Sequence, residues 1–382
     1  MKVLILSCNT GEGHNSCAAA LEEECRNQNI PCDTEDALRF ISPEVSRFIS
    51  NWHVRIYRHA PGLFRVGYRA AEDHPAQFHE GSALYRYLTQ GAEKLCGFIA
   101  GSGYDTVICT HTFAALMVSE VVKTHLPNLK TCFIATDYTC SPSVKDSSLD
   151  RYFIPASSLS GDFLGGGVTS ERLRACGIPV RQMFRSSVRK EDAKRAFGIP
   201  ADHKHLVMMC GSMGCGPIMS IARRIGRDLP DDQDLTIVCG TNDRLFDRLS
   251  RRFQRRFYDA KNVHVRSYVK DMALLMDSAD LYLTKPGGIS VTEAASMRLP
   301  MVFIDAVAGC EEYNKDFFLR TGGAVTGQTP KEIARTSLRL LSDEHTLEKM
   351  GDALDAAVPH NAAANILSEM SEAEEEKEED LA

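Results

Sequence analysis

Short apolar segments, each about one β-strand long, alternate with helical segments along most of this chain. In the first half they are residues 2–7, 105–110, 130–135 and 150–154. In the second half they are residues 204–210, 234–239, 262–266, 279–284 and 300–304. Strands that alternate with helices form parallel sheets with helices on both faces. The sequence therefore predicts an α/β fold with doubly wound parallel sheets.

The length of 382 residues corresponds to about two domains. The alternation breaks near residues 177–181 and restarts with a strand, a glycine turn and a helix. We predict a Rossmann-like domain over 1–187, a second over 188–355, and a remainder, 356–382, holding the end of a helix and a disordered acidic tail. Doubly wound domains bind ligands at the carboxyl ends of their strands, so we expect the site in a cleft between the domains.

The net charge of −7 is concentrated at one end of the chain. Between Glu369 and Asp380, eight acidic residues and one lysine carry all of it, a pattern typical of a disordered tail. The nearly neutral remainder gives no indication of nucleic-acid binding. Thirteen cysteines without a C-x-x-C pair, no secretory signal and no apolar run of 18 residues predict a cytosolic protein with reduced thiols.

The stretch from Leu283 to Ala295 reads as a strand, a glycine turn and a helix. The free N–H groups and the positive dipole end of such a helix suit a diphosphate. The residues that form this turn and helix start are Pro286, Gly287, Gly288, Ile289 and Ser290. Glu293 follows within two turns, where its carboxylate can accept hydrogen bonds from ribose hydroxyls.

Glu311, Glu312 and Asn314 follow the next strand, where polar side chains can hold a sugar. Phosphate, ribose and sugar in this order predict a nucleotide-sugar site, and a dinucleotide site is the nearest alternative. A second phosphate-compatible loop follows the first strand of the second domain and contains Gly211, Ser212, Met213 and Gly214. It matches neither the P-loop nor the dinucleotide fingerprint.

His14 is the candidate catalytic base of the first domain. It follows the first strand and a turn that Gly11 and Gly13 permit, and Asn15 or Ser16 can cap the helix that comes next. A helix N-terminus disfavours the charged form of histidine and keeps it available as a base. The alternative is a histidine that only caps the helix or packs against it.

Two more candidates, His111 and Asp137, lie at strand ends of the same domain. Residues at the carboxyl ends of parallel strands often contact ligands. Either residue can instead be structural.

Residues 51–71 interleave basic and aromatic side chains, with no acidic residue between Glu44 and Glu72. The residues of interest are Trp52, Arg55, Tyr57, Arg58, Phe64 and Arg65. This mixture suits an anionic membrane surface, although an ordinary amphipathic helix pair or a single-stranded nucleic-acid site would also use it. The sequence contains no metal-binding motif, so we expect no metal and no cofactor.

The motifs together resemble the monogalactosyldiacylglycerol synthase and processive diacylglycerol glucosyltransferase group of glycosyltransferase family 28. The residues that carry the resemblance are Gly11–His14, Ala135–Tyr138, Cys210–Gly214, Thr284–Gly288, Glu293, Pro300, Glu311, Glu312 and Asn314. The resemblance implies a GT-B fold, a UDP-sugar in the second domain, a diacylglycerol acceptor in the first, and inversion at the anomeric carbon without a bound metal. It also implies a cytoplasmic protein that is peripheral on the inner face of the cell membrane.

The resemblance assigns roles residue by residue. Gly287 and Gly288 would face the diphosphate together with Ser212 and Gly214, and Glu293 would take the ribose. The backbone of Tyr268 and Val269 would face uracil. His14 would be the catalytic base, and Asp137 is the alternative candidate for that role. Cys310 stands where the family usually has glutamine, and a thiol is the weaker hydrogen-bonding group for a hexose. Two alternatives stay open: an N-acetylglucosaminyltransferase acting on a polyprenyl-linked cell-wall intermediate, and a non-catalytic UDP-sugar-binding protein.

Overall fold

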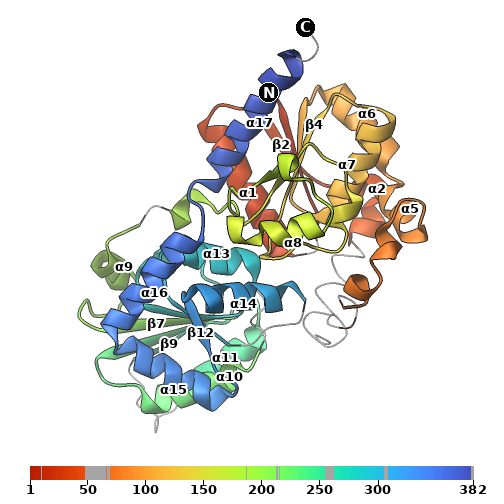
Figure 1. Ribbon diagram of the computed structural model, residues 1–382. Coiled ribbons are helices and arrows are strands. Elements are labelled where there is room, and N and C mark those ends of the chain that lie inside the picture. Colours follow the sequence, from red (N-terminus) through yellow and green to blue (C-terminus); the bar gives the residue numbers. More distant parts are fainter. Residues whose placement is uncertain are drawn as a thin grey trace. The chain divides into compact units, whose positions relative to one another are not determined.

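The computed structural model divides the chain into two compact units (Figure 1). The described residues are 1–9, 11–47, 66, 69–185, 187–211, 214, 216–253, 262–304 and 309–379. Unit 1 holds Met1–Gln182 and the segment from Pro359 onward, whereas unit 2 holds most residues from Met183 to Val358.

Unit 1 is built on a six-stranded parallel sheet with the order β2-β1-β3-β4-β5-β6. Its strands are β1 (Val3–Ser7), β2 (Cys32–Asp36), β3 (Thr106–Cys109), β4 (Lys130–Ile134), β5 (Arg151–Phe153) and β6 (Leu173–Arg174). Its helices are α1 (Glu12–Asn27), α2 (Leu38–Ile41), α5 (Ala83–Thr89), α6 (Ala92–Ser102), α7 (Thr112–Thr124), α8 (Ser160–Gly165) and α17 (Ala362–Glu379). The chain places β2 on one side of β1 and places β3 to β6 on the other side. The topological switch point of unit 1 therefore lies between β1 and β3.

Unit 2 contains a second six-stranded parallel sheet, with the order β12-β11-β10-β7-β8-β9. Its strands are β7 (Lys204–Met209), β8 (Gln233–Val238), β9 (Val263–Arg266), β10 (Leu281–Thr284), β11 (Met301–Phe303) and β12 (Ala324–Thr326). Its helices are α9 (Lys190–Phe197), α10 (Ile218–Asp228), α11 (Asp243–Phe253), α12 (Met272–Asp277), α13 (Gly288–Ser296), α14 (Cys310–Thr321), α15 (Pro330–Leu341) and α16 (Glu344–Ala357). This is the strand order of dinucleotide-binding sheets, and its switch point lies between β7 and β10.

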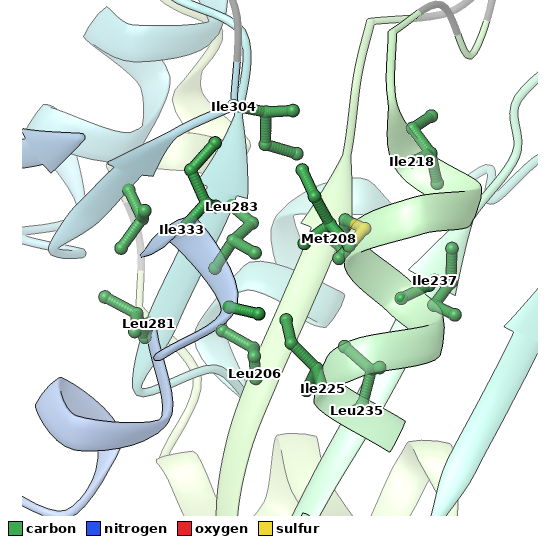
Figure 2. Packing of buried hydrophobic residues seen from close by; sticks show 14 of the residues in the cluster. Leu206, Met208, Ile218, Ile225, Leu235, Ile237, Leu281, Leu283, Ile304 and Ile333 are labelled. Atoms are coloured by element: carbon green, nitrogen blue, oxygen red, sulfur yellow. The ribbon is translucent and has the colours of Figure 1, made fainter. Parts of the chain in front are cut away.

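The core of unit 2 lies between the sheet and the helices α10 and α15. Figure 2 shows Leu206 and Met208 of β7 and Leu283 of β10 packed against Ile225 of α10 and Ile333 of α15. These side chains are at most 2% exposed. Because both faces of the sheet are covered, its central strands are continuous apolar runs, which is the signal that made them visible in the sequence.

The C-terminal helix belongs to unit 1, where α17 contacts α1 and β4. Ile366, Leu367 and Met370 are fully buried, and Glu369 pairs with Arg174 through an Nε–Oε2 contact of 3.0 Å. The sequence predicted a disordered tail from Glu369 onward, but the structure continues the helix to Glu379. The apolar residues anchor its first turns, and glutamate is a good helix former.

Candidate functional site

Three candidate residues of unit 1 follow three neighbouring strands of its sheet. His14 follows β1, His111 follows β3, and Asp137 follows β4. The carboxyl ends of these strands meet beside the switch point, so the structure brings the three residues to the same end of the sheet. The rings of His14 and His111 lie with their centroids 4.5 Å apart, and the charge of Asp137 acts on His14.

The hydrogen bonds of His14 determine which ring nitrogen carries its proton. Nδ1 lies 2.8 Å from the carbonyl oxygen of Thr110, and 3.1 Å from Oγ1 of Thr136. A carbonyl oxygen can only accept a hydrogen bond, so we assign the proton of the neutral ring to Nδ1. The lone pair then lies on Nε2, which makes no hydrogen bond to any described residue. A fixed Nδ1–H with an available Nε2 is the arrangement of a general base.

His14 is also tuned toward its neutral form. Removal of the half-buried His14 ring from water lowers its pKa, and this effect outweighs the charge of Asp137 and the Thr110 carbonyl, which both raise it. The ring is therefore unprotonated near neutral pH, as a base must be before it accepts a proton. Thr110 and Thr136 were missed by the sequence analysis, because a backbone carbonyl and a common hydroxyl carry no motif.

His111 has a structural role in the fold. Its Nδ1 accepts a hydrogen bond of 3.0 Å from the backbone N–H of Phe113, so it caps the N-terminus of α7. The proposed contact of His111 with an acceptor stays a prediction.

The turn before α1 differs in one respect from the sequence analysis. Gly11 is the N-cap of α1, Gly13 lies in its first turn, and no side chain caps the helix. Asn15, expected as a cap, instead contacts Ser7 at 2.8 Å and Asn9 at 3.0 Å. The uncapped N–H groups of the first turn remain directed to the end of the sheet where His14 lies.

In unit 2, two glycine loops follow the strands on either side of the switch point. Gly211 and Gly214 follow β7 and have φ angles of 66° and 56°. A β-carbon on Gly214 would lie 2.5 Å from the carbonyl oxygen of Cys239, so this position requires glycine. Ser212 and Met213, predicted to share this loop, lie outside the described residues.

The second loop follows β10 and begins α13. Gly287 is the N-cap without a side-chain cap, and Gly288 is the first helical residue, so the N–H groups of the first turn are available to an anion. Ile289 is buried, and Ser290 lies 3.4 Å from the hydroxyl of Tyr282. The sequence predicted this strand, glycine turn and helix, and the structure contains all three.

Buried polar side chains of α14 support the second loop. Asn314 is fully buried and donates a hydrogen bond of 2.9 Å to the carbonyl of Pro286. Glu311 lies beside Gly287, and its Oε2 lies 3.9 Å from Nζ of Lys285. Lys285 is only 5% exposed and was not among the candidates, although its charge lies directly before the glycine turn.

The other donor candidates occupy less enclosed positions. Glu293 is half-buried in the second turn of α13, and Cys310 and Glu312 are half-buried at the start of α14. Tyr268 follows the edge strand β9 and is 66% exposed, and Val269 beside it is half-buried. Their roles toward ribose, hexose and uracil stay predictions.

Trp52, Arg55, Tyr57, Arg58, Phe64 and Arg65 lie outside the described residues. Among the residues that the structure does describe, no helix has the length and apolar character needed to cross a membrane. The same residues include no group of histidine, cysteine or acidic side chains arranged to hold a metal.

Comparison with known proteins assigns a family model to each half of the chain. Residues 14–180 match the model described as monogalactosyldiacylglycerol (MGDG) synthase, and residues 227–355 match glycosyl transferases group 1. The processive diacylglycerol beta-glucosyltransferase of Bacillus pumilus is 25% identical over 97% of this chain and 94% of its own length. The enzyme of the same name from Bacillus subtilis is 26% identical over 91% of this chain and 89% of its own length.

Among solved structures, MurG of Acinetobacter baumannii superimposes with a TM-score of 0.64. It is 14% identical, and the match covers 97% of this chain and 99% of that one. These findings confirm the predicted resemblance and the GT-B fold class, with its two Rossmann-like domains.

Proposed function

Since this chain is a relative of the monogalactosyldiacylglycerol synthases and the processive diacylglycerol β-glucosyltransferases, we propose that it is an inverting glycosyltransferase. It moves a hexose from a UDP-sugar to the free hydroxyl of 1,2-diacylglycerol and forms a β-glycosyl-diacylglycerol. The observation that carries this proposal is similarity to the Bacillus pumilus enzyme over 97% of the chain, which includes both units.

His14 acts as the base in this proposal. The acceptor oxygen attacks the anomeric carbon, the bond from that carbon to UDP breaks, and the acceptor proton passes to Nε2 of His14. The Thr110 carbonyl holds the ring through Nδ1–H, and the charge of Asp137 favours the imidazolium that forms. A base with a lowered pKa and a fixed tautomer supports this assignment over a histidine that only packs.

The leaving diphosphate binds to the two glycine loops of unit 2. The first turn of α13 offers N–H groups and a positive dipole end, and the loop that holds Gly211 and Gly214 follows the neighbouring strand β7. Buried Lys285 adds a positive charge directly before the α13 turn. These groups supply positive potential, so we propose that transfer needs no metal and persists in EDTA.

The decisive experiment offers labelled UDP-glucose, UDP-galactose and UDP-N-acetylglucosamine with diacylglycerol or a polyprenyl-linked acceptor. We expect transfer to diacylglycerol, and a loss of about 10²–10⁴-fold in His14→Ala. His125→Ala is the matched control, because His125 is exposed at the C-terminal end of α7. Transfer only to the polyprenyl acceptor would overturn the diacylglycerol assignment, and tight UDP binding without transfer to any lipid would overturn catalysis itself.

The acceptor is a membrane lipid, so the proposal includes peripheral binding at the inner, anionic face of the cell membrane. Its support is the basic and aromatic composition of residues 51–71. Charge reversal at Arg55, Arg58 and Arg65 should reduce co-sedimentation with anionic vesicles. Equal co-sedimentation of the variant and the parent would refute the role of this segment.

A further inference from the structure

A surface pocket of unit 2 is lined mainly by basic residues of two packed helices. Arg224 and Arg227 come from the end of α10, and Lys331 and Arg335 come from the start of α15. Asp228 is the only acidic residue in the lining, so the pocket carries a net charge of +3. None of these residues belongs to the two glycine loops of the donor site.

Asp228, the acidic residue of the pocket lining, already forms an ion pair with Arg227. Arg227 contacts both carboxylate oxygens of Asp228, through Nε and Nη2, each at 2.7 Å. Among the described residues, Arg224, Lys331 and Arg335 form no ion pair, and the buried Nε of Arg224 has no hydrogen-bond partner. The guanidinium of Arg224 therefore keeps a donor that no described residue uses.

Helix electrostatics do not account for the cluster. Arg227 in the last turn of α10 suits the negative end of the helix dipole, but Lys331 lies in the first turn of α15, where a cation is unfavourable. Gathering cations around one hollow also costs repulsion unless an anion is bound. Ala334 and Leu338 complete the lining, and most of the exposed lining surface is apolar, so the basic side chains also contribute their aliphatic stems.

We propose that this α10/α15 basic pocket binds a phosphate group. Arginine forks recognise phosphate oxygens through paired N–H donors, and lysine adds a point charge. The phosphate can be carried by the headgroup of an anionic phospholipid or by a soluble ion or ester. The chemistry of recognition is the same in both cases, so the source is decided by experiment.

The test compares two double variants of the full chain. Arg224→Ala with Arg335→Ala removes two lining residues, and Arg223→Ala with Arg339→Ala removes two exposed arginines of the same helices outside the pocket. Two probes are used: phosphatidylglycerol vesicles, with phosphatidylcholine vesicles as reference, and inorganic phosphate. UDP affinity is measured alongside, and we expect it to be the same in both variants, which separates this pocket from the donor site.

We expect the pocket variant to bind more weakly than the control variant by about 30-fold, from about 1 kcal/mol for each basic residue. Loss toward vesicles alone identifies the lipid headgroup, and loss toward inorganic phosphate identifies a site that soluble phosphate fills. Equal affinities of the two variants for both probes would overturn the proposal. If the pocket variant fails to fold, Lys331→Ala replaces it, because Lys331 is an exposed residue of the lining. The affinity for the same probes should then fall by about 5-fold.

Discussion

Replacing Gly214 by alanine tests how the first glycine loop is held against the sheet of unit 2. With φ at 56°, an alanine here carries a strain of about 1–2 kcal/mol. Its β-carbon would also lie 2.5 Å from the Cys239 carbonyl oxygen. That oxygen accepts a hydrogen bond of 3.2 Å from the N–H of Asn242, so it cannot move without breaking the start of α11. Overpacking of this kind costs a further ~1–3 kcal/mol.

Gly211→Ala is the matched control for Gly214→Ala. Its φ is 66°, but a β-carbon there would meet nothing within 4 Å. The strain is partly offset by about 0.4–1 kcal/mol from the loss of freedom in the unfolded chain, which leaves a net cost of about 1 kcal/mol. Gly214→Ala benefits from the same offset, so its net cost is about 2–4 kcal/mol. The two variants therefore separate the steric contact from the backbone conformation.

The assay is thermal unfolding with and without UDP. The transition that UDP shifts upward belongs to unit 2, because a ligand stabilises the unit that binds it. A domain of this size loses about 2–4 °C per kcal/mol, so we expect Tm to fall by about 4–16 °C in Gly214→Ala and by about 2–4 °C in Gly211→Ala. Equal Tm values for the two variants would refute the packing of the loop against Cys239.

Three further predictions follow from hydrogen bonds and burial. The lowered pKa of His14 predicts that kcat/KM keeps its neutral-pH value down to pH values below the ordinary histidine pKa of about 6.5, and a midpoint above it would contradict this. Asn314→Leu leaves the buried Pro286 carbonyl without this donor and should cost about 1–3 kcal/mol in urea unfolding, together with weaker UDP binding; unchanged stability would refute it. Burial lowers the pKa of His205 to about 4, so protonation of the unfolded chain destabilises unit 2 as pH falls from about 6.5 toward 4, by about 3 kcal/mol in total. His205→Gln should abolish this pH dependence in denaturant unfolding, and an unchanged slope would exclude His205 as its origin.

The sequence predicted the interior strands because burial on both faces requires apolar runs. It missed β2, whose residues are Cys-Asp-Thr-Glu-Asp, because an edge strand with exposed side chains has no such run. It missed β12 for a related reason, since this short strand lies at an edge of the unit 2 sheet. Ile366, Leu367 and Met370 form only a short apolar pattern, and their burial depends on contacts with the opposite end of the chain.

The sequence identified candidate site residues where a polar side chain comes directly after a strand. His14 and Asp137 could be singled out because each follows an apolar strand, and the structure adds that β1, β3 and β4 are neighbours in the sheet. The Thr110 carbonyl, which sets the tautomer of His14, could not be predicted, because a backbone atom is the same in every residue. The sequence also could not show that Asn314 is used to hold the Pro286 turn, since an amide suits a sugar equally well.

The return of α17 to unit 1 affects how the protein is made on the ribosome. Unit 2 ends at Val358, so it can fold as soon as that residue has left the exit tunnel. Unit 1 emerges first, but it lacks the helix that covers α1 and β4 until the last residues are released. The half that is synthesised first is therefore completed last, and its uncovered helix and strand are the surfaces that a nascent-chain chaperone would meet.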